Sequence, residues 1–578
     1  MNLSSLASLL LAACQAPASV APPEPGETVM RVVDMGSLTL RTSGADLSDT
    51  VWPALSYDEG ETGWDYALDV DEDAPARLLR LLFQRDFEIE GNSIEYQGQG
   101  RFAIQAPSSL HDRIAKILPA AAAALGSELE LELAFVKLEE PLQGTALVPD
   151  AQASALVEAA AKEGRASRRR FSLSSARPET FSQGKWVEVV TDYDVEVAQG
   201  TFVFDPITWR VQLGTRIALR AAPGKGGTHL ALNLRRARAT SEVSERFLTR
   251  SSRIGNEQQS RTEAPDLLHQ RLPILDEGLG LSTFLPEGQA LAIASSQGSA
   301  NLGEALIVRR VSGNLARTAR LGSGSESLLL VDLTAWAPPY VTSRWDEQGA
   351  MQSPTDPYSE GPSMTIGLSA SRERGVDIAS LIYNRVDQDE SPIGNYEEFG
   401  PWLALAPKGD AALPDIEAEY ADLAPDQRVV QVALTLKAPG GKAPIASLSL
   451  PLRAGATSSA LLGVEDTYAG NVDVEVAQYA SVEDPGMRAL FDGVMLELEP
   501  RFALDGSLSL RLRGQASARD GEPQKHMLAR GSVGEIETAA ESFLMIAETL
   551  HFPAGQKTAR GAVGDLADGL SLEVEVRY

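Results

Sequence analysis

The stretch Asp194-Val-Glu-Val-Ala-Gln199 occurs a second time in the chain as Asp473-Val-Glu-Val-Ala-Gln478, which lies 279 positions later. At this offset, ten of the twenty-one positions from 194 to 214 are identical without a gap, including the pair Gly214 and Gly493. Self-similarity at a fixed offset is the sequence signature of a repeated structural unit. The sequence therefore predicts two related units, with the repeated stretch forming an equivalent strand in each.

A later match helps to set the limits of the two units. Pro286-Glu-Gly-Gln289 pairs with Pro553-Ala-Gly-Gln556 at an offset of 267, so about twelve residues differ between the copies. We place the units at residues 127–340 and 416–578, with a loop-rich connecting region at 341–415 between them. Duplication of this kind favours a scaffold or a binding surface over a single active site.

The residues before the units, 29–126, predict a small α+β module. Asp73 and Pro75 favour the start of a helix, and Pro119 is expected to kink or end a second one. The expected elements of the module and its following strand are a helix from Asp73 to about Phe83, strands at Ser93–Tyr96 and Phe102–Gln105, a helix from Ser108 or Ser109 toward Gly126, and a strand at Glu128–Leu138.

The rest of the chain reads mostly as strands. One further helix is expected at 151–163, with Asp150 as its cap and Gly164 as its stop. Strands are expected at Trp186–Val190, Asp194–Ala198, Val211–Arg220 and Leu230–Leu234. The segments 346–362 and 386–415 are rich in Pro, Gly, Asp and Ser and predict long surface loops. The predicted fold class is α+β, predominantly β: a small α+β N-terminal module followed by two related β-rich units.

Length and charge limit the classes of function. A chain of 578 residues is too long for one core, so several domains are expected. Its formal net charge of −29 opposes binding to nucleic acid and to anionic lipid head groups. With one cysteine, the chain has no internal disulfide and no zinc site built on several cysteines.

That single cysteine, Cys14, ends the short apolar stretch Leu6-Ala-Ser-Leu-Leu-Leu-Ala-Ala-Cys14 and precedes a Pro/Ala-rich segment. About nine apolar residues match the core of a signal peptide and are too few to span a membrane. The tetrad Leu11-Ala-Ala-Cys14 resembles the bacterial lipobox, which implies a signal peptide at 1–13, acylation of Cys14 and a tether at 14–28. Gln15 after the cysteine resembles a signal for delivery to the outer membrane. The alternative is a frayed apolar N-terminus with a buried cysteine.

No arrangement of residues typical of catalysis, metal binding or cofactor binding was found. The five histidines are dispersed, and the chain contains no His-Glu-x-x-His and no Gly-x-Ser-x-Gly. Gly224-Lys-Gly-Gly227 lacks the phosphate-loop spacing and predicts a hairpin turn between two strands. The acidic run from Asp69 to Asp73 lacks the glycine and the final glutamate of a calcium loop. We expect a non-enzymatic protein without a cofactor.

One segment differs in charge from the rest of the chain. Residues 165–253 contain sixteen Lys and Arg but eight Asp and Glu. The patch can be a solvated strand face, or a surface that docks onto acidic groups of a second copy or of another part of this chain. The arginines of this possible basic docking patch are Arg165, Arg168, Arg169, Arg170, Arg235, Arg236 and Arg238.

The order of short motifs from 127 to 335 resembles the core of the secretin family, the outer-membrane ring proteins of bacterial secretion systems such as types II and III. In the second unit, Gly493-Val-Met-Leu-Glu-Leu-Glu-Pro-Arg501 followed by Asp505-Gly-Ser-Leu-Ser-Leu510 carries the same resemblance. The remaining motifs are Ser175-Ala-Arg-Pro178, Gly184-Lys185, Gly214-x-x-Ile217-x-Leu219, Pro286-Glu-Gly-Gln289 and Glu326–Thr334.

The resemblance and Cys14 together imply a lipid-anchored, secretin-like structural or assembly component of a secretion or outer-membrane complex, facing the periplasm. Its expected partners are the membrane, through the lipid anchor, and other envelope proteins or further copies of itself. The alternative is a periplasmic or surface lipoprotein that binds a glycan or a peptide. The mass of the extracted protein separates the two, because an assembly component forms multimers.

Overall fold

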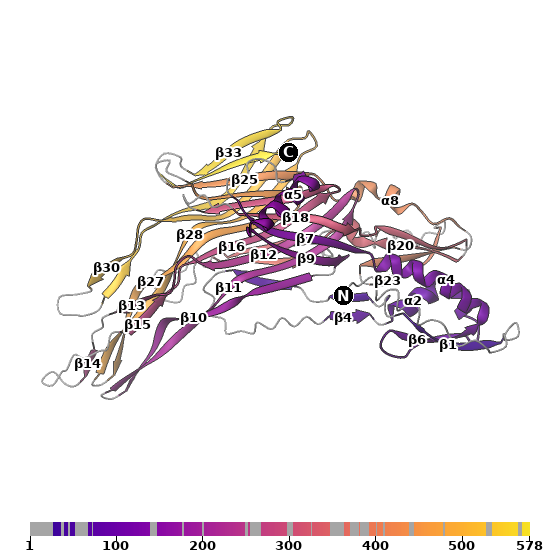
Figure 1. Cartoon of the computed structure of the whole chain (residues 1–578), viewed down its shortest axis with the longest axis horizontal. Coiled ribbons are helices and arrows are strands. Elements are labelled where there is room, and N and C mark those ends of the chain that lie inside the picture. The colour runs from indigo at the N-terminus through magenta and orange to yellow at the C-terminus, as the bar shows by residue number, and fades with distance from the viewer. Residues whose placement is uncertain are drawn as a thin grey trace.

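The computed structural model describes residues 27–35, 38, 40–43, 47–52, 68–71, 73–138, 147–175, 179–198, 201–248, 252–254, 267–297, 304–324, 326–346, 363–369, 381, 392–399, 401–408, 411–438, 444–477, 480–527, 535–564 and 569–578. Cys14 and the expected signal peptide lie outside these ranges. The molecule is elongated, with a helix-containing module at one end and long β-hairpins that extend toward the other (Figure 1). It is a predominantly β structure with few helices, so the predicted fold class is confirmed.

The N-terminal module packs helices on a three-stranded sheet. The sheet has the order β1-β6-β5, and the main helices are α2 and α4. Asp73 occupies the N-cap position of α2, and a proline lies in its first turn, as expected. The bounds are β1 Thr28–Asp34, α2 Ala74–Leu82, α3 Gln84–Phe87, β5 Ser93–Tyr96, β6 Arg101–Pro107 and α4 Ser108–Leu125.

Helix α4 runs through Pro119 and ends at Gly126, so the proline does not end the helix. Interior proline removes one backbone hydrogen bond of a helix. Here the alanines after Pro119 favour helix, and Ala121, Ala124 and Leu125 are buried against the module core. This packing holds the last two turns of the helix in place.

A four-stranded sheet adjoins the module. Its order is β19-β20-β24-β23, with bounds Thr318–Ser323, Glu326–Asp332, Trp402–Pro407 and Ile393–Phe399. Leu328 and Trp402 belong to the module core, whereas Leu329 and Leu403 face a second cluster on the other side. Strands β23 and β24 lie where the sequence predicted a surface loop. The apolar run from Trp402 to Ala406 is buried on both faces. The sequence analysis assigned it to a loop because the residues around it are rich in Pro and Gly.

Two large sheets form the body of the molecule. Sheet 1 has the order β10-β11-β12-β16-β27-β28-β29-β32, and sheet 2 has the order β33-β34-β25-β26-β17-β18-β7-β9. Leucine, valine and isoleucine side chains from both sheets form one continuous core between them. The bounds in sheet 1 are Glu179–Ala198, Thr201–Gly224, Gly227–Ala239, Ile274–Pro286, Ser458–Ala477, Ala480–Phe502, Leu508–Arg519 and Glu541–Phe552. In sheet 2 they are Thr558–Gly564, Ser571–Arg577, Val429–Lys437, Pro444–Arg453, Gln289–Gln297, Glu304–Gly313, Glu128–Lys137 and Ala166–Ser174.

The strands fall into two sets with the same order. We call β7, β9, β10, β11, β12, β16, β17 and β18 unit 1, and β25, β26, β27, β28, β29, β32, β33 and β34 unit 2. In chain order, each unit runs through the same pairings: its first two strands and last two strands lie in sheet 2, and its middle four lie in sheet 1. Each of the two sheets therefore contains four strands of unit 1 next to four strands of unit 2.

The repeated stretch lies at the same place in both units. Asp194–Ala198 and Asp473–Ala477 end the first strand of a long hairpin, where Asp194 pairs with Asp205 and Asp473 pairs with Asp484. Further along these hairpins, Gly184 lies opposite Gly214 and Gly463 lies opposite Gly493. A Cβ added to either Gly214 or Gly493 would lie 2.2 Å from a carbonyl oxygen of the opposite strand. The expected equivalence of the repeated strands is confirmed, and Gly214 and Gly493 also occupy equivalent positions, within the strands and not at turns.

The remaining elements are short. Helix α5 starts one residue earlier than expected: Pro149 is its N-cap, and Asp150, the expected cap, is its first residue. The helix stops before Gly164, whose φ of 70° reverses the chain, and Gly224–Gly227 is the expected turn. The other bounds are β2 Leu40–Ser43, β3 Leu47–Trp52, β4 Leu68–Asp71, β8 Leu147–Pro149, α5 Asp150–Lys162, β13 Ser244–Leu248, β14 Ser252–Ile254, β15 Leu267–Arg271, η2 Leu333–Ala335, β21 Tyr340–Asp346, β22 Ser363–Ser369, α8 Ile416–Glu419, η4 Ala421–Leu423, β30 Gln524–Met527 and β31 Glu535–Thr538.

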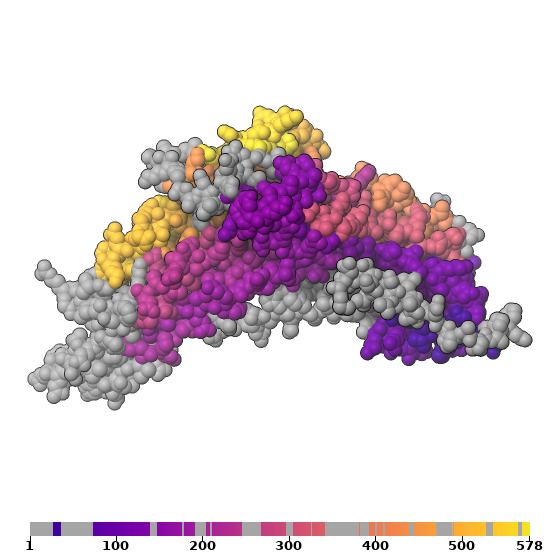
Figure 2. Space-filling model, in the orientation of Figure 1, coloured from indigo at the N-terminus to yellow at the C-terminus, as the bar shows by residue number. Residues whose placement is uncertain are grey.

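In the part of the chain that the structure describes, none of the helices combines the length and the hydropathy that a membrane crossing requires. Figure 2 shows the N-terminal module (indigo) at one end of the molecule, with the strands of unit 1 (magenta) extending toward the other end.

Candidate functional site

The junction between the two units is built by backbone pairing in both sheets. In sheet 1, residues 274–280 of β16 pair antiparallel with residues 459–465 of β27. In sheet 2, residues 294–297 of β17 pair with residues 446–449 of β26. We call these two pairings the internal seam. The last sheet-1 strand of unit 1 thus lies beside the first sheet-1 strand of unit 2, which is a head-to-tail arrangement.

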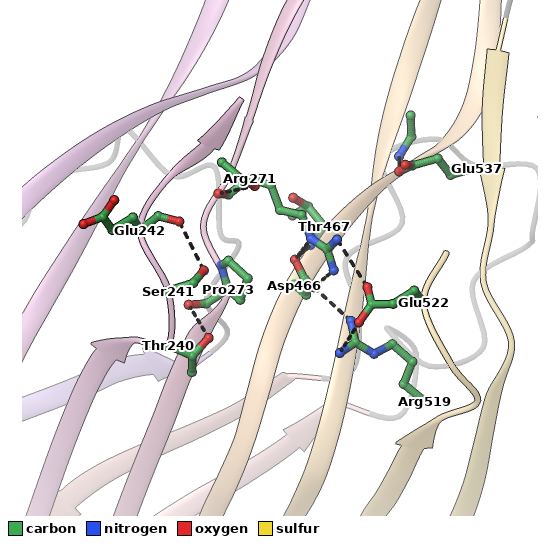
Figure 3. A network of polar contacts seen from close by, with 12 residues as sticks. Thr240, Ser241, Glu242, Arg271, Pro273, Asp466, Thr467, Arg519, Glu522 and Glu537 are labelled. Atoms are coloured by element: carbon green, nitrogen blue, oxygen red, sulfur yellow. Dashed lines mark hydrogen bonds and ion pairs between the residues drawn. The ribbon is translucent and has the colours of Figure 1, made fainter. Parts of the chain in front are cut away.

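A charged network crosses the internal seam (Figure 3). Arg271, at the end of β15 and just before strand β16 of unit 1, forms a hydrogen-bonded ion pair with Asp466 of unit 2, and both side chains are nearly inaccessible to solvent. Arg519 also binds Asp466, at 3.0 Å between Nη1 and Oδ2, and Glu522 lies 3.6 Å from each arginine. The buried charges of Arg271 and Asp466 are therefore paired, as burial of charge requires, and the exposed Glu522 lies at the margin of the network.

The outer edges of sheet 1 carry the strands that correspond to the two sides of the seam. The β10 edge corresponds to β27, and the β32 edge corresponds to β16. Residues 459–463 of β27 are buried at the seam, whereas their counterparts 180–184 on β10 are mostly exposed. In the part of the chain that the structure describes, no further strand of sheet 1 follows β10 or β32, and we call these two outer sides the open edges. An unpaired strand edge is a template for pairing with another chain.

Large apolar side chains are exposed on both open edges. Trp186 on β10 is 45% exposed, and Phe543 and Met545 on β32 are 67% and 41% exposed. The neighbours Leu544 and Ile546 point into the core between the sheets. Side chains alternate along a strand, so Phe543 and Met545 point outward, away from the other large sheet. The sequence analysis did not identify these three residues. Alignment of the two repeats could have found them, because Trp186, Phe543 and Met545 align with Glu465, Asp276 and Gly278, none of which has an apolar side chain.

The first group of predicted basic residues lies on or beside β9, the edge strand of sheet 2. Arg165 binds Glu163, and Arg168 binds Glu158 at 2.7 Å. Arg168 thereby lowers the pKa of Glu158, mainly through its hydrogen bond. Arg170 lies 3.6 Å from Glu130 and 3.8 Å from Glu132, and the Arg169 guanidinium lies 4.1 Å from the ring centre of Phe181.

The second group, Arg235, Arg236 and Arg238, lies on β12 and faces carboxylates of neighbouring strands. Arg235 binds Asp276 at 3.0 Å, and Arg236 and Arg238 share Glu277 and Glu304. Burial raises the pKa of Asp276, whereas Arg235 opposes that rise. The structure thus places all seven arginines against groups of this chain. Docking of a partner's acidic surface on them stays a prediction.

A buried carboxyl joins the four-stranded sheet to unit 1. Asp332 Oδ1 accepts hydrogen bonds from the Thr334 N–H at 2.9 Å and from its hydroxyl at 2.6 Å. The hydroxyls of Thr334 and Ser175 lie 2.9 Å apart. Burial raises the pKa of Asp332 to about 6, and its hydrogen bonds with Ser175 and Thr334 limit the rise. This network is a structural joint, since its groups are hidden from solvent.

No group of three or more metal-binding side chains occurs within the residues that the structure describes. His229 is fully buried, and burial lowers its pKa well below the usual value, with Arg453 adding to the effect. A neutral, enclosed imidazole of this kind supports packing. The chemistry that the open edges offer is strand pairing with apolar contact, because Trp186, Phe543 and Met545 are exposed there.

Comparisons with known proteins found no matching family model and no matching curated sequence. Among solved structures, the secretin InvG of the Salmonella SPI-1 type III secretion injectisome aligns with 64% of this chain and 94% of its own, at 11% identity and a TM-score of 0.21. PulD of the Klebsiella pneumoniae type II secretion system aligns over 97% of this chain and 75% of its own, at 10% identity and a TM-score of 0.15. For Aeromonas hydrophila ExeD these values are 95%, 88%, 9% and 0.14. TM-scores of this size do not establish a shared fold.

Proposed function

We propose that this protein is a non-enzymatic structural component of the bacterial cell envelope that assembles head to tail with copies of itself through the open edges of its two large sheets. The observation that carries the proposal is the internal seam. One chain already contains a unit 1 to unit 2 junction, and each chain ends in the two edges that could form the same junction again.

The two edges differ from each other, so the resulting interface is heterologous. The side of unit 2 that ends in β32 and β33 would meet the side of unit 1 that begins with β10 and β9. Repetition of a heterologous contact gives a ring if the rotation closes and a filament if it does not. Either product is an extended wall of β-sheet, which suits a structural protein.

The exposed side chains favour burial of the open edges in an assembly. Trp186, Phe543 and Met545 expose apolar surface on these two strands, and an unpaired strand edge is a template for pairing with another chain. Burial of such surface contributes roughly 25 cal/mol per Å² to association. Strand pairing adds backbone hydrogen bonds along the same edge.

The envelope location rests on the N-terminal sequence. Cys14 follows a short apolar core and resembles the acylated cysteine of bacterial lipoproteins. Diacylation of that residue would anchor the chain stably, which one acyl chain does not. The Pro-rich segment after Cys14 would then act as a semi-extended tether between the membrane and the N-terminal module.

Light scattering of the mature protein in mild detergent tests the proposal. We expect a mass of several chains that increases with concentration. Trp186→Lys places a charge on an open edge and should shift the protein toward single chains. Leu504→Lys is the matched control, because Leu504 is exposed in the turn between β28 and β29 and does not belong to β10 or β32. A single-chain mass at every concentration would contradict self-assembly and favour the binding lipoprotein.

A further inference from the structure

The internal seam supplies a register for contact between chains. At the seam, Ile274 lies opposite Glu465, Asp276 opposite Gly463, and Gly278 opposite Leu461. Each residue of β10 corresponds to the residue of β27 that lies 279 positions later in the chain. The paired glycines show this offset, because Gly184–Gly214 in unit 1 corresponds to Gly463–Gly493 in unit 2.

The counterpart of β16 is found in the same way. Thr228 pairs with Leu285 in unit 1, and the equivalent pair in unit 2 is Leu508 with Phe552. Each residue of β16 therefore corresponds to the residue of β32 that lies 267 positions later in the chain. The turns that follow support this correspondence, since Gly288 and Gly555 both adopt positive φ, at 72° and 80°. The counterparts of Ile274, Asp276 and Gly278 are therefore Glu541, Phe543 and Met545.

We propose, on the basis of the self-assembly proposed above, that β32 of one chain pairs with β10 of the next in this register, so that Phe543 lies opposite Gly184. The pairing places Glu541 opposite Trp186 and Met545 opposite Ser182. Gly184 has no side chain, so the ring of Phe543 can lie over its backbone, which is how aromatic residues support glycine in neighbouring strands. Trp186 is then a diagonal neighbour of Phe543.

The direction of the exposed side chains is consistent with this register and excludes a slip of one residue. Phe181 packs against the core between the sheets, so Ser182, Gly184 and Trp186 point outward. Phe543 and Met545 also point outward, because Leu544 and Ile546 join the same core. A slip of one residue would place Trp186 on the face opposite to Phe543 and Met545. The seam register brings all three apolar side chains onto one face.

The contact between chains differs in chemistry from the internal seam. The charged network at the seam uses Arg271, Asp466 and Arg519. Their repeat counterparts are Thr538 on β31, Val187 on β10 and Ala239 on β12, none of which carries a charge. An ion-paired junction inside the chain would thus alternate with an aromatic junction between chains. This difference favours pairing of β32 with β10 over pairing of β32 with β27, because β10 offers an apolar partner and β27 offers a charged one.

Disulfide trapping tests the register. The variant combines Trp186→Cys with Glu541→Cys in a mature chain that also carries Cys14→Ser, so the introduced thiols are the only ones. Residues opposite each other in antiparallel strands lie within disulfide range. We expect oxidation to give a ladder of linked chains on a non-reducing gel. The matched control combines Trp186→Cys with Ser542→Cys, whose side chains lie on opposite faces in this register, and should link at least tenfold less.

A second variant measures the aromatic contact. Phe543→Ala should weaken association about tenfold or more, because it removes the ring that lies over Gly184. The fold of the single chain should be unaffected, because Phe543 is not part of the core. Leu504→Ala should leave association unchanged. If light scattering shows multi-chain species but the Ser542 control links as well as the Glu541 variant, or if neither links, the register is overturned while self-assembly stands. If every variant and the natural chain remain single, both proposals fail.

Discussion

The backbone N–H of Val190 donates a hydrogen bond to the side-chain Oε1 of Gln270, with 3.1 Å between the two atoms. In unit 2, the N–H of Ala469 donates to Oε2 of Glu537, also at 3.1 Å. The donors are 279 residues apart and the acceptors 267 apart, as the equivalent strands require. In each unit this bond fixes the short hairpin, β13–β15 or β30–β31, beside the long hairpin. One acceptor is neutral and the other is a carboxylate, so the position requires an acceptor and not a charge.

Substitution of Gln270 tests this reading. Gln270→Glu keeps an acceptor and reproduces the residue of unit 2, so we expect a loss below about 0.5 kcal/mol in the free energy of unfolding. Gln270→Ala leaves the Val190 N–H without its acceptor and should cost about 1–3 kcal/mol. Urea denaturation of both variants measures the difference. Equal losses would show that the side-chain acceptor does not matter.

The ion pair at the internal seam should be costly to break. Arg271 and Asp466 are largely buried, so Asp466→Ala leaves a buried guanidinium without its main partner. We expect a loss of roughly 3–5 kcal/mol in the free energy of unfolding. The control is Arg560→Ala, which removes a pair with Glu575 on an 81% exposed arginine and should cost under about 1 kcal/mol. Similar denaturation midpoints for the two variants would argue against a stabilising role of the seam network.

Asp332 should make stability depend on pH. Burial raises its pKa to about 6, so the folded protein retains a proton that the unfolded chain, with a pKa of 3.8, has lost. This contribution is fully present below pH 3.8 and is lost as the pH rises through about 6. Asp332→Asn removes the ionisation. Between pH 4 and 7.5, its stability relative to the natural protein should therefore increase, by up to about 3 kcal/mol.

Melting temperatures of the two proteins across that pH range supply the measurement. Other titrating groups, including His229, are common to both proteins and cancel in the difference. A difference that stays constant from pH 4 to 7.5 would mean that Asp332 keeps the same protonation state in the folded and unfolded chains.

The N-terminus offers a prediction that is independent of the fold. Cleavage between Ala13 and Cys14 with acylation of Cys14 gives a mature chain that begins with a lipid-modified cysteine. Mass spectrometry of the N-terminal peptide detects this directly. Cys14→Ser should abolish the modification and release the protein from the membrane fraction. An N-terminal peptide that retains Met1, or an unmodified Cys14, would exclude the lipid anchor.

Much of the local structure could be predicted from the sequence because its signals are local. The Pro75 start of α2, the Gly164 stop after α5 and the Gly224–Gly227 turn follow from backbone preferences of single residues. The equivalence of the repeated hairpins could also be predicted, since ten identities mark it. The buried strand at 402–407 was missed, because a short apolar run between Pro and Gly carries no periodicity that separates strand from loop.

The arrangement of the units and the open edges could not be predicted. Strand pairing between β16 and β27 joins residues nearly two hundred positions apart, and no local pattern encodes such a pairing. The basic residues were noticed because they are charged, yet Arg235 and Arg168 are paired with carboxylates of this chain. Trp186 and Phe543 differ from their repeat counterparts, and that difference gains meaning when the edges are known.

Amide hydrogen exchange on the assembled protein tests the central claim most directly. We expect residues 180–186 and 541–547 to gain protection together as the protein concentration rises, whereas the seam residues 274–280 and 459–465 should be protected at every concentration. If the two edge segments exchange as rapidly in the multi-chain species as in single chains, the open edges do not join the copies, and the account is wrong.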